Sequence, residues 1–202
     1  MKNEIEKLLG IESNAISSIP ITDAYEKSID LLFEKIHTNG GKIIVSGMGK
    51  AGQIADSIAT TFCSTGSPAI FLHPSEAQHG DLGVIRKNDV LIVISNSGKT
   101  REIIELVALT HLLHSDIPVI VITGNKESEL VEESDIAIYT GKPLEVCPLG
   151  LTPTTSTTTM TVIGDILVVL LMKRIGFNAN DYAKRHHGGY LGEKSRLKNQ
   201  NK

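Results

Sequence analysis

Cysteine is scarce in this chain of 202 residues. Cys63 and Cys147 are the only two, and neither lies in a CxxC or similar ligand spacing. No group of His, Asp and Glu has the local spacing of a zinc site either, so neither a disulfide framework nor a metal is expected. The pattern predicts two buried or loop thiols in a reducing compartment.

Long apolar runs are also lacking. The longest, residues 166–172, is far shorter than the roughly 20 residues that a membrane-spanning helix needs. The first residues, Met-Lys-Asn-Glu-Ile-Glu-Lys, are charged and contain no apolar signal region. We therefore expect a cytoplasmic protein with no membrane partner.

An excess of positive charge is absent as well. The formal net charge is -3 and the pI is near 6.2, whereas a nucleic-acid-binding surface would be strongly basic. A nucleic-acid partner is therefore not expected. The basic residues near the C-terminus are interpreted as a frayed, solvated tail rather than a binding arm: Lys194, Arg196, Lys198 and Lys202.

What the chain does contain is a regular alternation of short apolar runs and helical stretches. Runs that are apolar at nearly every position indicate strands covered on both faces, which is typical of a parallel sheet. The pattern predicts an α/β fold, a doubly wound three-layer αβα sandwich around a five-stranded parallel sheet. The predicted strands are residues 42–46, 69–72, 90–95, 119–123 and 136–139. The predicted helices are residues 5–17 and 22–37 (split by Ile19-Pro20), 51–64, 101–114, 126–133 and 157–176.

Two Ser/Gly-rich turns follow the first and third predicted strands: Ser46-Gly-Met-Gly-Lys50 and Ser95-Asn-Ser-Gly-Lys-Thr100. In the flavodoxin-like strand order these strands flank the point where ligands bind, and each turn opens a helix whose free N–H groups attract anions. The alternative is that Ser97 and Thr100 merely cap a helix. We favour a site for a phosphorylated sugar, and its predicted phosphate ligands are Ser46, Gly47, Ser95, Asn96, Ser97 and Thr100.

The first turn also spells G-x-G-x-x-G at Gly47, Gly49 and Gly52, so a dinucleotide site has to be considered. Such a site needs an acidic residue at the end of the second strand, where this chain has Leu72-His73-Pro74. A P-loop is disfavoured too, because Lys50 is followed by Ala51 rather than Ser or Thr.

The residues 152–161 are rich in threonine and serine and predict the start of a helix, since hydroxyl groups cap free N–H groups. They are more numerous than one cap requires, so the alternative is that some face the ligand.

Five further residues are candidates for chemistry. Lys50 lies at the start of a helix, where a cation opposes the helix dipole unless an anion is bound nearby. Glu102 is in a first helical turn, where an acidic residue is also favoured for structural reasons alone. Glu145 is in a loop, where the alternative to a functional role is a solvated side chain. His79 and His186 lie in glycine-containing loops and could supply acid–base groups with the glutamates.

These motifs together resemble the SIS (sugar isomerase) domain family, and specifically the D-arabinose-5-phosphate isomerases. The resemblance covers residues 25–194, nearly the whole chain. The stretches that carry it are residues 46–50, 73–83, 94–98, 145–154 (Glu-Val-Cys-Pro-Leu-Gly-Leu-Thr-Pro-Thr) and 186–192.

The resemblance implies one SIS domain over residues 1–202, with N-terminal helices at 1–40, the α/β core at 41–176 and a C-terminal helical segment and tail at 177–202. It implies interconversion of D-ribulose 5-phosphate and D-arabinose 5-phosphate through a cis-enediol, the first step toward the lipopolysaccharide sugar Kdo. No cofactor is implied. The carried-over active-site candidates are Lys50, His79, Glu102, Glu145 and His186, with a glutamate as base, His186 managing oxygen protons and Lys50 stabilising the enediolate.

The family also implies a homotetramer or homodimer with sites near subunit interfaces, where the His186 segment would complete a neighbour's pocket. Three departures stand out. Lys99 replaces the usual Glu or small residue, and His187 replaces the usual Pro after His186, which leaves open which histidine acts. The pair of CBS domains that most members carry is also absent from this sequence. We therefore hypothesise that a later Kdo-pathway product inhibits at the sugar site.

Two other functions remain open at this stage. One is isomerisation of a hexulose or heptulose phosphate on the same fold. The other is non-catalytic sensing of a sugar phosphate, as in some transcription regulators, although the roughly 40 residues before the first strand are short and acidic for a DNA-binding domain.

Overall fold

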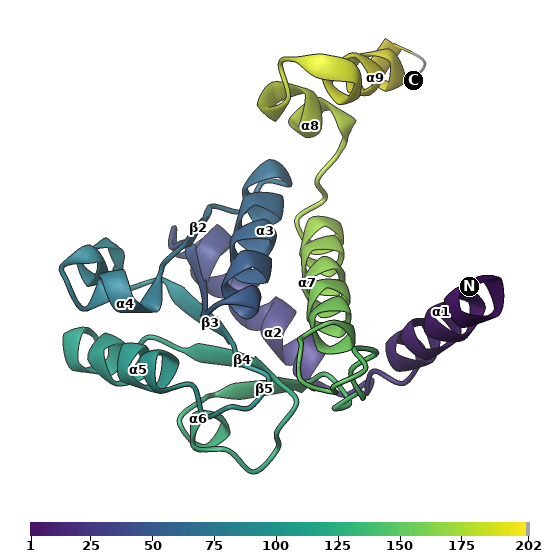
Figure 1. The fold of residues 1–202 in the computed structure, drawn as a ribbon. Coiled ribbons are helices and arrows are strands. Elements are labelled where there is room, and N and C mark those ends of the chain that lie inside the picture. Colours follow the sequence, from purple (N-terminus) through teal and green to yellow (C-terminus); the bar gives the residue numbers. More distant parts are fainter. Residues whose placement is uncertain (201–202) are drawn as a thin grey trace.

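The centre of the fold is a five-stranded parallel sheet in the order β2-β1-β3-β4-β5 (Figure 1). The computed structural model describes the backbone of residues 1–200 and the side chains of residues 1–196. The strands are β1 (Ile43–Gly47), β2 (Ala69–Phe71), β3 (Val90–Ile94), β4 (Val119–Thr123) and β5 (Ile136–Tyr139). The predicted fold class and flavodoxin-like strand order are therefore confirmed.

The apolar runs explain why the sheet is covered on both sides. Every residue of β1, β3 and β4 is buried. Successive side chains of a strand point to opposite faces, so Ile43 and Val45 enter one core and Ile44 enters the other. Helices α2 (Ala24–Leu32), α3 (Lys50–Ser64) and α7 (Thr155–Arg174) cover the first face. Helices α4 (Pro74–Ala77), α5 (Arg101–Leu113) and α6 (Glu129–Glu132) cover the second.

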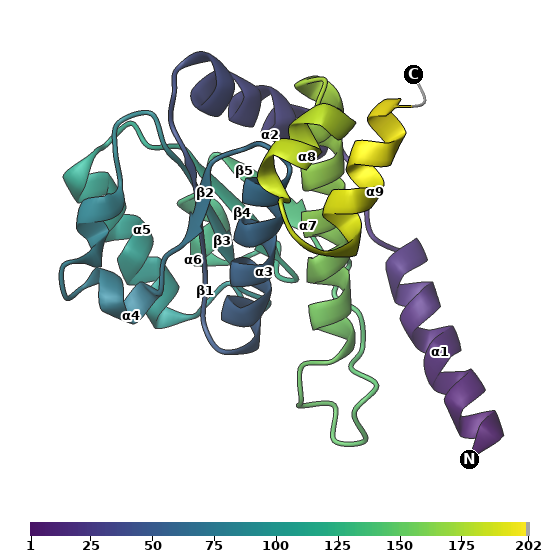
Figure 2. The same ribbon diagram turned by 90° about the horizontal axis from the view of Figure 1, so that it is seen from above.

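The N-terminal helices are separated at Ile19-Pro20, as predicted. Helix α1 (Lys2–Ser17) projects away from the sheet (Figures 1 and 2), while α2 packs against α7 and β5 and continues as a π-helical turn, η1 (Phe33–Thr38).

Some local predictions need correction. The helix predicted at residues 126–133 is only the four residues of α6, because the side chain of Asn125 accepts the Glu127 N–H and holds the chain in a turn first. The polar loop after β2 contains α4 and a 3₁₀ turn, η2 (Asp81–Val84). Cys147 lies in a loop as expected, but Cys63 is an exposed residue of α3.

The C-terminal segment forms two helices, α8 (Ala179–Arg185) and α9 (Gly189–Gln200), which pack on each other beyond the far end of α7 (Figure 1). The segment predicted as a frayed tail is thus helical as far as Gln200. Lys202 and the side chain of Lys198 lie outside the described residues.

Helix α7 is long and apolar enough to cross a membrane by length and composition alone, contrary to the expectation from residues 166–172. Half of its apolar stretch is buried, and it packs against α2 and α3. The core helix of a protein can have the same length and apolar composition, and α7 is such a core helix here.

Candidate functional site

Three helices begin at the same place on the carboxyl edge of the sheet. The first turns of α3 and α7 and the N-cap of α5 surround a pocket of about 490 Å³, called here the sheet-edge pocket. Its polar lining residues are Lys50, Ser95, Asn96, Ser97, Lys99, Thr100, Asn125, Lys142, Ser156 and Thr157. Since the N-terminus of a helix carries partial positive charge and free N–H groups, this convergence favours an anion.

The turn after β1 is shaped by its glycines. A Cβ at Gly47 would lie 2.6 Å from the carbonyl oxygen of Ala51, and one at Gly52 would lie 2.7 Å from that of Gly47. Gly49 has a φ of 60°. The G-x-G-x-x-G spacing therefore allows α3 to start directly against the strand and requires no dinucleotide to explain it.

Ser46 and Gly47, predicted as phosphate ligands, do not line the pocket. The Ser46 side chain is fully buried, and its hydroxyl donates to the carbonyl oxygen of Leu72 at 2.6 Å. Both residues build the turn that presents Lys50.

The turn after β3 is held by its own hydrogen bonds. The hydroxyls of Ser95 and Thr100 lie 2.9 Å apart, and the Lys99 N–H donates to the Ser97 hydroxyl at 3.2 Å. The Asn125 amide donates to the carbonyl oxygen of Ser97 at 3.0 Å. Asn96 and Ser97 stay exposed at the pocket. The predicted residues Ser95, Asn96, Ser97 and Thr100 are thus brought together with Lys50.

Three exposed lysines line the sheet-edge pocket: Lys50, Lys99 and Lys142. None of them forms an ion pair with any residue in the described part of the chain. Lys142 is also the one described residue other than glycine with a positive φ, 52°. Such strain costs about 1–3 kcal/mol and is often found at functional sites. The lysines and the helix ends together make this pocket suitable for a phosphate group.

Lys142 and Asn125 are pocket residues that the sequence analysis missed. Each follows the end of a strand, β5 and β4, by two or three residues. Polar residues that follow parallel strands meet at one edge of the sheet. The sequence analysis applied this rule only to the first and third strands, and its use on the fourth and fifth would have found both residues. Within residues 152–161, Ser156 and Thr157 are the hydroxyl residues that line the pocket, so they are the ones that the ligand-facing alternative would concern.

The two glutamates differ in their surroundings. One carboxylate oxygen of Glu145 accepts hydrogen bonds from the Thr154 N–H (2.7 Å), the Thr154 hydroxyl (2.9 Å) and the Ser156 N–H (3.3 Å), so Glu145 caps α7. Burial raises the pKa of this carboxyl, but hydrogen bonds from Ser156 and Thr154 outweigh it, and the net pKa is lowered. Glu102 is half-buried in the first turn of α5 and makes no hydrogen bond or ion pair with a described residue. Neither glutamate lines the pocket.

Cys147 lies two residues after Glu145 in the same loop. The Thr152 hydroxyl and the N–H groups of Leu151, Thr152 and Leu149 lower the pKa of its thiol to about 6. The thiolate form therefore predominates at neutral pH.

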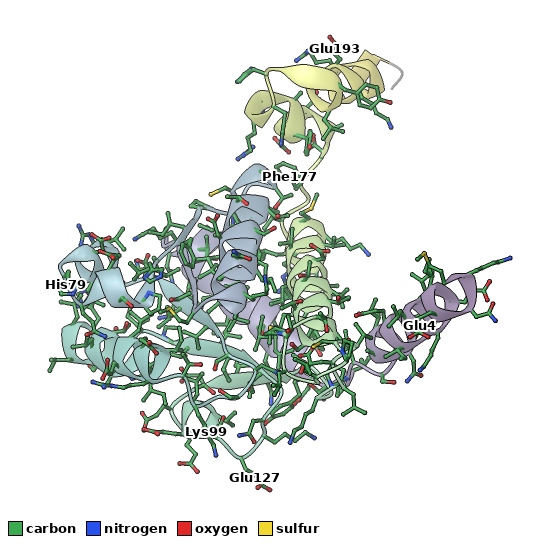
Figure 3. The ribbon with its side chains drawn as sticks, viewed as in Figure 1. Glu4, His79, Lys99, Glu127, Phe177 and Glu193 are labelled. Atoms are coloured by element: carbon green, nitrogen blue, oxygen red, sulfur yellow. The ribbon has the colours of Figure 1, made fainter. Side chains whose placement is uncertain are left out.

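The structure does not bring the two predicted histidines to this pocket within one chain. His79 is exposed after α4, at a different edge of the molecule from Lys99 (Figure 3). His186 follows α8, beyond the C-terminal end of α7, whereas the pocket lies at the N-terminal end; the 20 residues of α7 span about 30 Å. Across residues 1–196, no three His, Cys, Asp or Glu side chains gather closely enough to hold a metal ion.

The chain is similar to known proteins in both sequence and fold. Residues 35–170 match the model of the SIS domain. The chain is 44% identical over 194 residues to arabinose 5-phosphate isomerase KdsD of Escherichia coli K12, covering 96% of this chain but 58% of that protein. The chain thus spans little more than half the length of that relative.

Two solved structures cover almost the same length as this chain. A candidate phosphosugar isomerase involved in capsule formation from Bacteroides fragilis is 63% identical, with a TM-score of 0.93, covering 94% of this chain and 99% of that one. The E. coli CFT073 protein c3406, solved in complex with arabinose 5-phosphate, is 33% identical, with a TM-score of 0.82, covering 90% of this chain and 95% of that one.

Proposed function

This chain belongs to the SIS domain family, and we propose that it is an aldose–ketose isomerase that interconverts D-ribulose 5-phosphate and D-arabinose 5-phosphate for Kdo biosynthesis. The observation that carries the proposal is the convergence of three helix N-termini and three unpaired lysines on one pocket in the described part of the chain. The names of the relatives, and the arabinose 5-phosphate bound by one of them, indicate which phosphorylated sugar that pocket takes.

The turn after β3 would hold the phosphate. The hydroxyls of Ser95, Ser97 and Thr100 and the N-terminus of α5 supply donors, and Lys99 supplies charge. Lys142 and the N-terminus of α7 close the other side of the pocket. The sugar would then extend toward Lys50, which lies on the adjacent turn.

The reaction moves two protons, one from C2 to C1 and one from O2 to O1. A base removes the proton from C2 of the open-chain aldose, the C2–H electrons form the C1=C2 bond, and O1 becomes an enediolate oxygen. O1 then takes up the proton that O2 gives up, the C2=O2 bond forms, and the base returns its proton to C1, which gives the ketose. Lys50 would stabilise the charge on the enediolate, which is largest in the transition state.

We assign the base to Glu102 rather than Glu145. The carboxylate of Glu145 accepts three hydrogen bonds at the start of α7 and has a lowered pKa, which makes it a weaker base. Glu102 has no such partner among the described residues and comes directly after the phosphate turn. Glu145 then keeps the pocket wall in place.

The site requires a second subunit in this proposal. Because α7 separates His186 from the pocket of its own chain, His186 would act in the pocket of a neighbour within a homodimer or homotetramer. His79, exposed at the surface, is available to a neighbour in the same way.

A cytoplasmic location, supported by the two free thiols, and inhibition at the sugar site by a later Kdo-pathway product are also part of the proposal. Purified enzyme that is unaffected by Kdo or its activated nucleotide form would contradict that inhibition.

The decisive experiment is an isomerase assay with ribulose 5-phosphate, alongside hexulose and heptulose phosphates. Glu102→Gln should lower kcat by about 10²–10⁴-fold without changing the folded state. Glu145→Gln should have a smaller effect on kcat, and Glu133→Gln, at an exposed position on the protein surface, should have none. Binding of arabinose 5-phosphate without turnover by wild type would instead indicate a sensor.

A further inference from the structure

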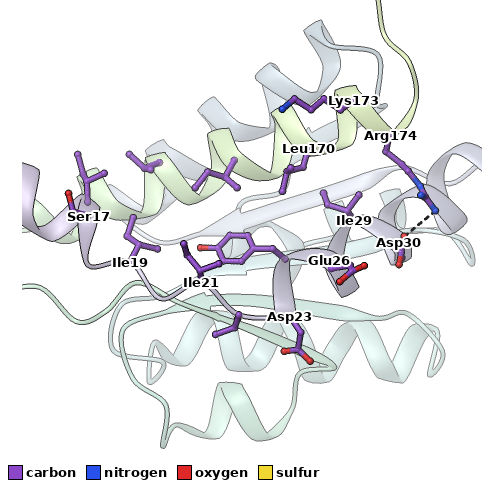
Figure 4. A pocket seen from close by; sticks show the side chains of 15 residues that line it. Ser17, Ile19, Ile21, Asp23, Glu26, Ile29, Asp30, Leu170, Lys173 and Arg174 are labelled. Atoms are coloured by element: carbon purple, nitrogen blue, oxygen red, sulfur yellow. Dashed lines mark ion pairs between the residues drawn. The ribbon is translucent and has the colours of Figure 1, made fainter.

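The C-terminal end of α1 is fixed to the body of the chain. Ile19, just past the helix, is buried in the core that α2, α3 and α7 form, and Ala15 in the last turn of α1 is buried as well. Ser17 and Ile19 lie beside α7 at one end of a groove of about 900 Å³ between α2 and α7 (Figure 4). The last turns of α1 therefore have a defined position against α7, although the first turns project away from it.

The end of α1 also lies against the loop that follows β5. A Cβ on Gly141 would lie 3.2 Å from the carbonyl oxygen of Ser18, and Gly141 has a φ of 82°. Both the close approach and the positive φ favour glycine at this position. The next residue is Lys142, which lines the sheet-edge pocket. One wall of that pocket therefore rests on the end of α1.

A second contact joins α1 to the first residue of α7. The Thr155 hydroxyl donates to Oε1 of Glu12 at 3.0 Å and accepts the Val146 N–H at 3.1 Å. Thr155 is fully buried, and the next residue, Ser156, lines the sheet-edge pocket. Because hydrogen bonds in a chain polarise one another, the acceptor on Glu12 strengthens the bond that holds Val146. Through one hydroxyl, Glu12 thus reaches both the loop before α7 and the first turn of that helix.

We propose that Glu12 is a positioning residue for the sheet-edge pocket. It orients the Thr155 hydroxyl, and this hydroxyl holds the loop at residues 145–154 and the first turn of α7 in the place where they wall the pocket. The other carboxylate oxygen of Glu12, Oε2, is buried and has no hydrogen-bond partner among residues 1–196. A buried acceptor without a partner costs free energy, so stability alone does not account for a carboxylate at this position.

Hydrogen–deuterium exchange tests the positioning without any substrate. In Glu12→Ala chains the peptide of residues 143–154 should exchange about fivefold faster, because the hydroxyl that holds the Val146 N–H loses its own acceptor. Glu12→Gln keeps an acceptor oxygen for Thr155 and should match wild type. Glu6→Ala, at an exposed position on the same helix, is the control and should match wild type too. Wild-type exchange in Glu12→Ala would overturn the proposal.

A double-mutant cycle separates positioning through Thr155 from a general loss of structure. Thr155→Val removes the hydroxyl and should itself speed exchange of the same peptide. Adding Glu12→Ala to Thr155→Val should then change the exchange by less than about twofold, whereas adding it to Thr155→Ser should have the full effect. The urea midpoint of Glu12→Ala should stay near that of wild type, because an unpartnered buried oxygen is removed together with the hydrogen bond. An equally large effect of Glu12→Ala in the Thr155→Val background would contradict the proposal.

The consequence for the substrate rests on the proposed function. Glu12→Ala should raise the KM for arabinose 5-phosphate about fivefold and change kcat by less than about twofold, since Lys50 and Glu102 belong to α3 and α5 rather than to the loosened wall. Faster exchange with an unchanged KM would overturn a role of Glu12 in the pocket. A wild type without isomerase activity would contradict the proposed function instead, and the exchange experiment would still decide whether Glu12 positions the loop.

Discussion

The rings of Tyr182 and His186 stack face to face, with centroids 3.7 Å apart and planes 7° apart. The Nδ1 atom of His186 lies 3.0 Å from the carbonyl oxygen of Tyr182. Because a carbonyl can only accept, Nδ1 carries the proton and Nε2 is left as the hydrogen-bond acceptor. One turn of α8 thus fixes both the orientation and the tautomer of the imidazole.

This relationship predicts that Tyr182 is a positioning residue. Tyr182→Ala should lower kcat about 10–100-fold, because a misplaced imidazole loses alignment with the sugar oxygens. Tyr182→Phe keeps the stacked ring and should retain nearly full kcat. The pH–rate profile of Tyr182→Ala should change while the KM does not. Tyr190→Ala, on the neighbouring helix α9, is the matched control, and equal losses in both alanine variants would contradict the prediction.

Mixing inactive chains should restore activity if neighbours share sites. Lys50→Ala and His186→Ala chains, each nearly inactive alone, should regain about a quarter of wild-type activity after unfolding and refolding together. The reason is that half of the dimers are mixed and each mixed dimer has one intact site. A mixture that stays inactive would mean that His186 serves its own chain or none.

Lys142 should contribute to binding of the sugar phosphate, while its positive φ strains the backbone. Lys142→Gly removes the side-chain charge from the pocket but accepts the positive φ of 52° without strain. The KM for the sugar phosphate should rise about tenfold while the free energy of unfolding stays the same or increases. Lys87→Gly, an exposed lysine outside the pocket, should leave KM unchanged. An unchanged KM in Lys142→Gly would remove this lysine from the phosphate site.

Glu145 should make stability depend on pH. Its pKa in the folded state is below the ordinary value, so its charge stabilises the fold above that ordinary pKa and the stabilisation is lost as pH falls through the folded value. Glu145→Gln should lower the free energy of unfolding by about 1 kcal/mol at pH 7, as expected for a helix cap. Urea unfolding of wild type and Glu145→Gln at pH 7 and pH 4 measures the difference between their free energies of unfolding. This difference should narrow at pH 4. A difference that does not narrow would argue against the ionised cap.

Cys147 should react as a thiolate at unusually low pH. Its pKa of about 6 predicts that alkylation by iodoacetamide reaches half its maximal rate near pH 6. Peptide mass spectrometry follows the residue separately from Cys63. Thr152→Val removes the hydroxyl that contributes most to lowering this pKa and should move that midpoint upward. A midpoint near 8.5 in wild type would show that the loop does not stabilise the thiolate.

The fold was predictable because its determinants are local. Strands such as β4 are apolar at nearly every position, and that pattern specifies burial on both faces and hence a parallel sheet. The place of the turn at residues 95–100 beside the pocket was predictable for the same reason, since serine and glycine after such a strand suit an anion. The bounds of β4 and β5 match the predicted ranges 119–123 and 136–139.

The composition of the pocket was decided by contacts between distant segments. Lys142 and Asn125 join Lys50 because the strands before them belong to the same sheet, a relation that no local pattern records. The hydroxyl of Ser46 donates to the carbonyl oxygen of Leu72, just past the end of β2 and 26 residues away in sequence, and Ser46 does not line the pocket. Glu145 caps α7 because its loop folds back over Thr154 and Ser156.

The amino-acid sequence by itself therefore determined the sheet, its order and the Ser/Gly turn at residues 95–100, since apolar periodicity and turn chemistry act over a few residues. Only the tertiary structure decided which charges surround the pocket and that His186 lies at the far end of α7. Helix α7 is rigid and about 30 Å long, so one chain cannot close that distance, and this length is the physical reason for proposing that the histidine meets a sugar in another subunit.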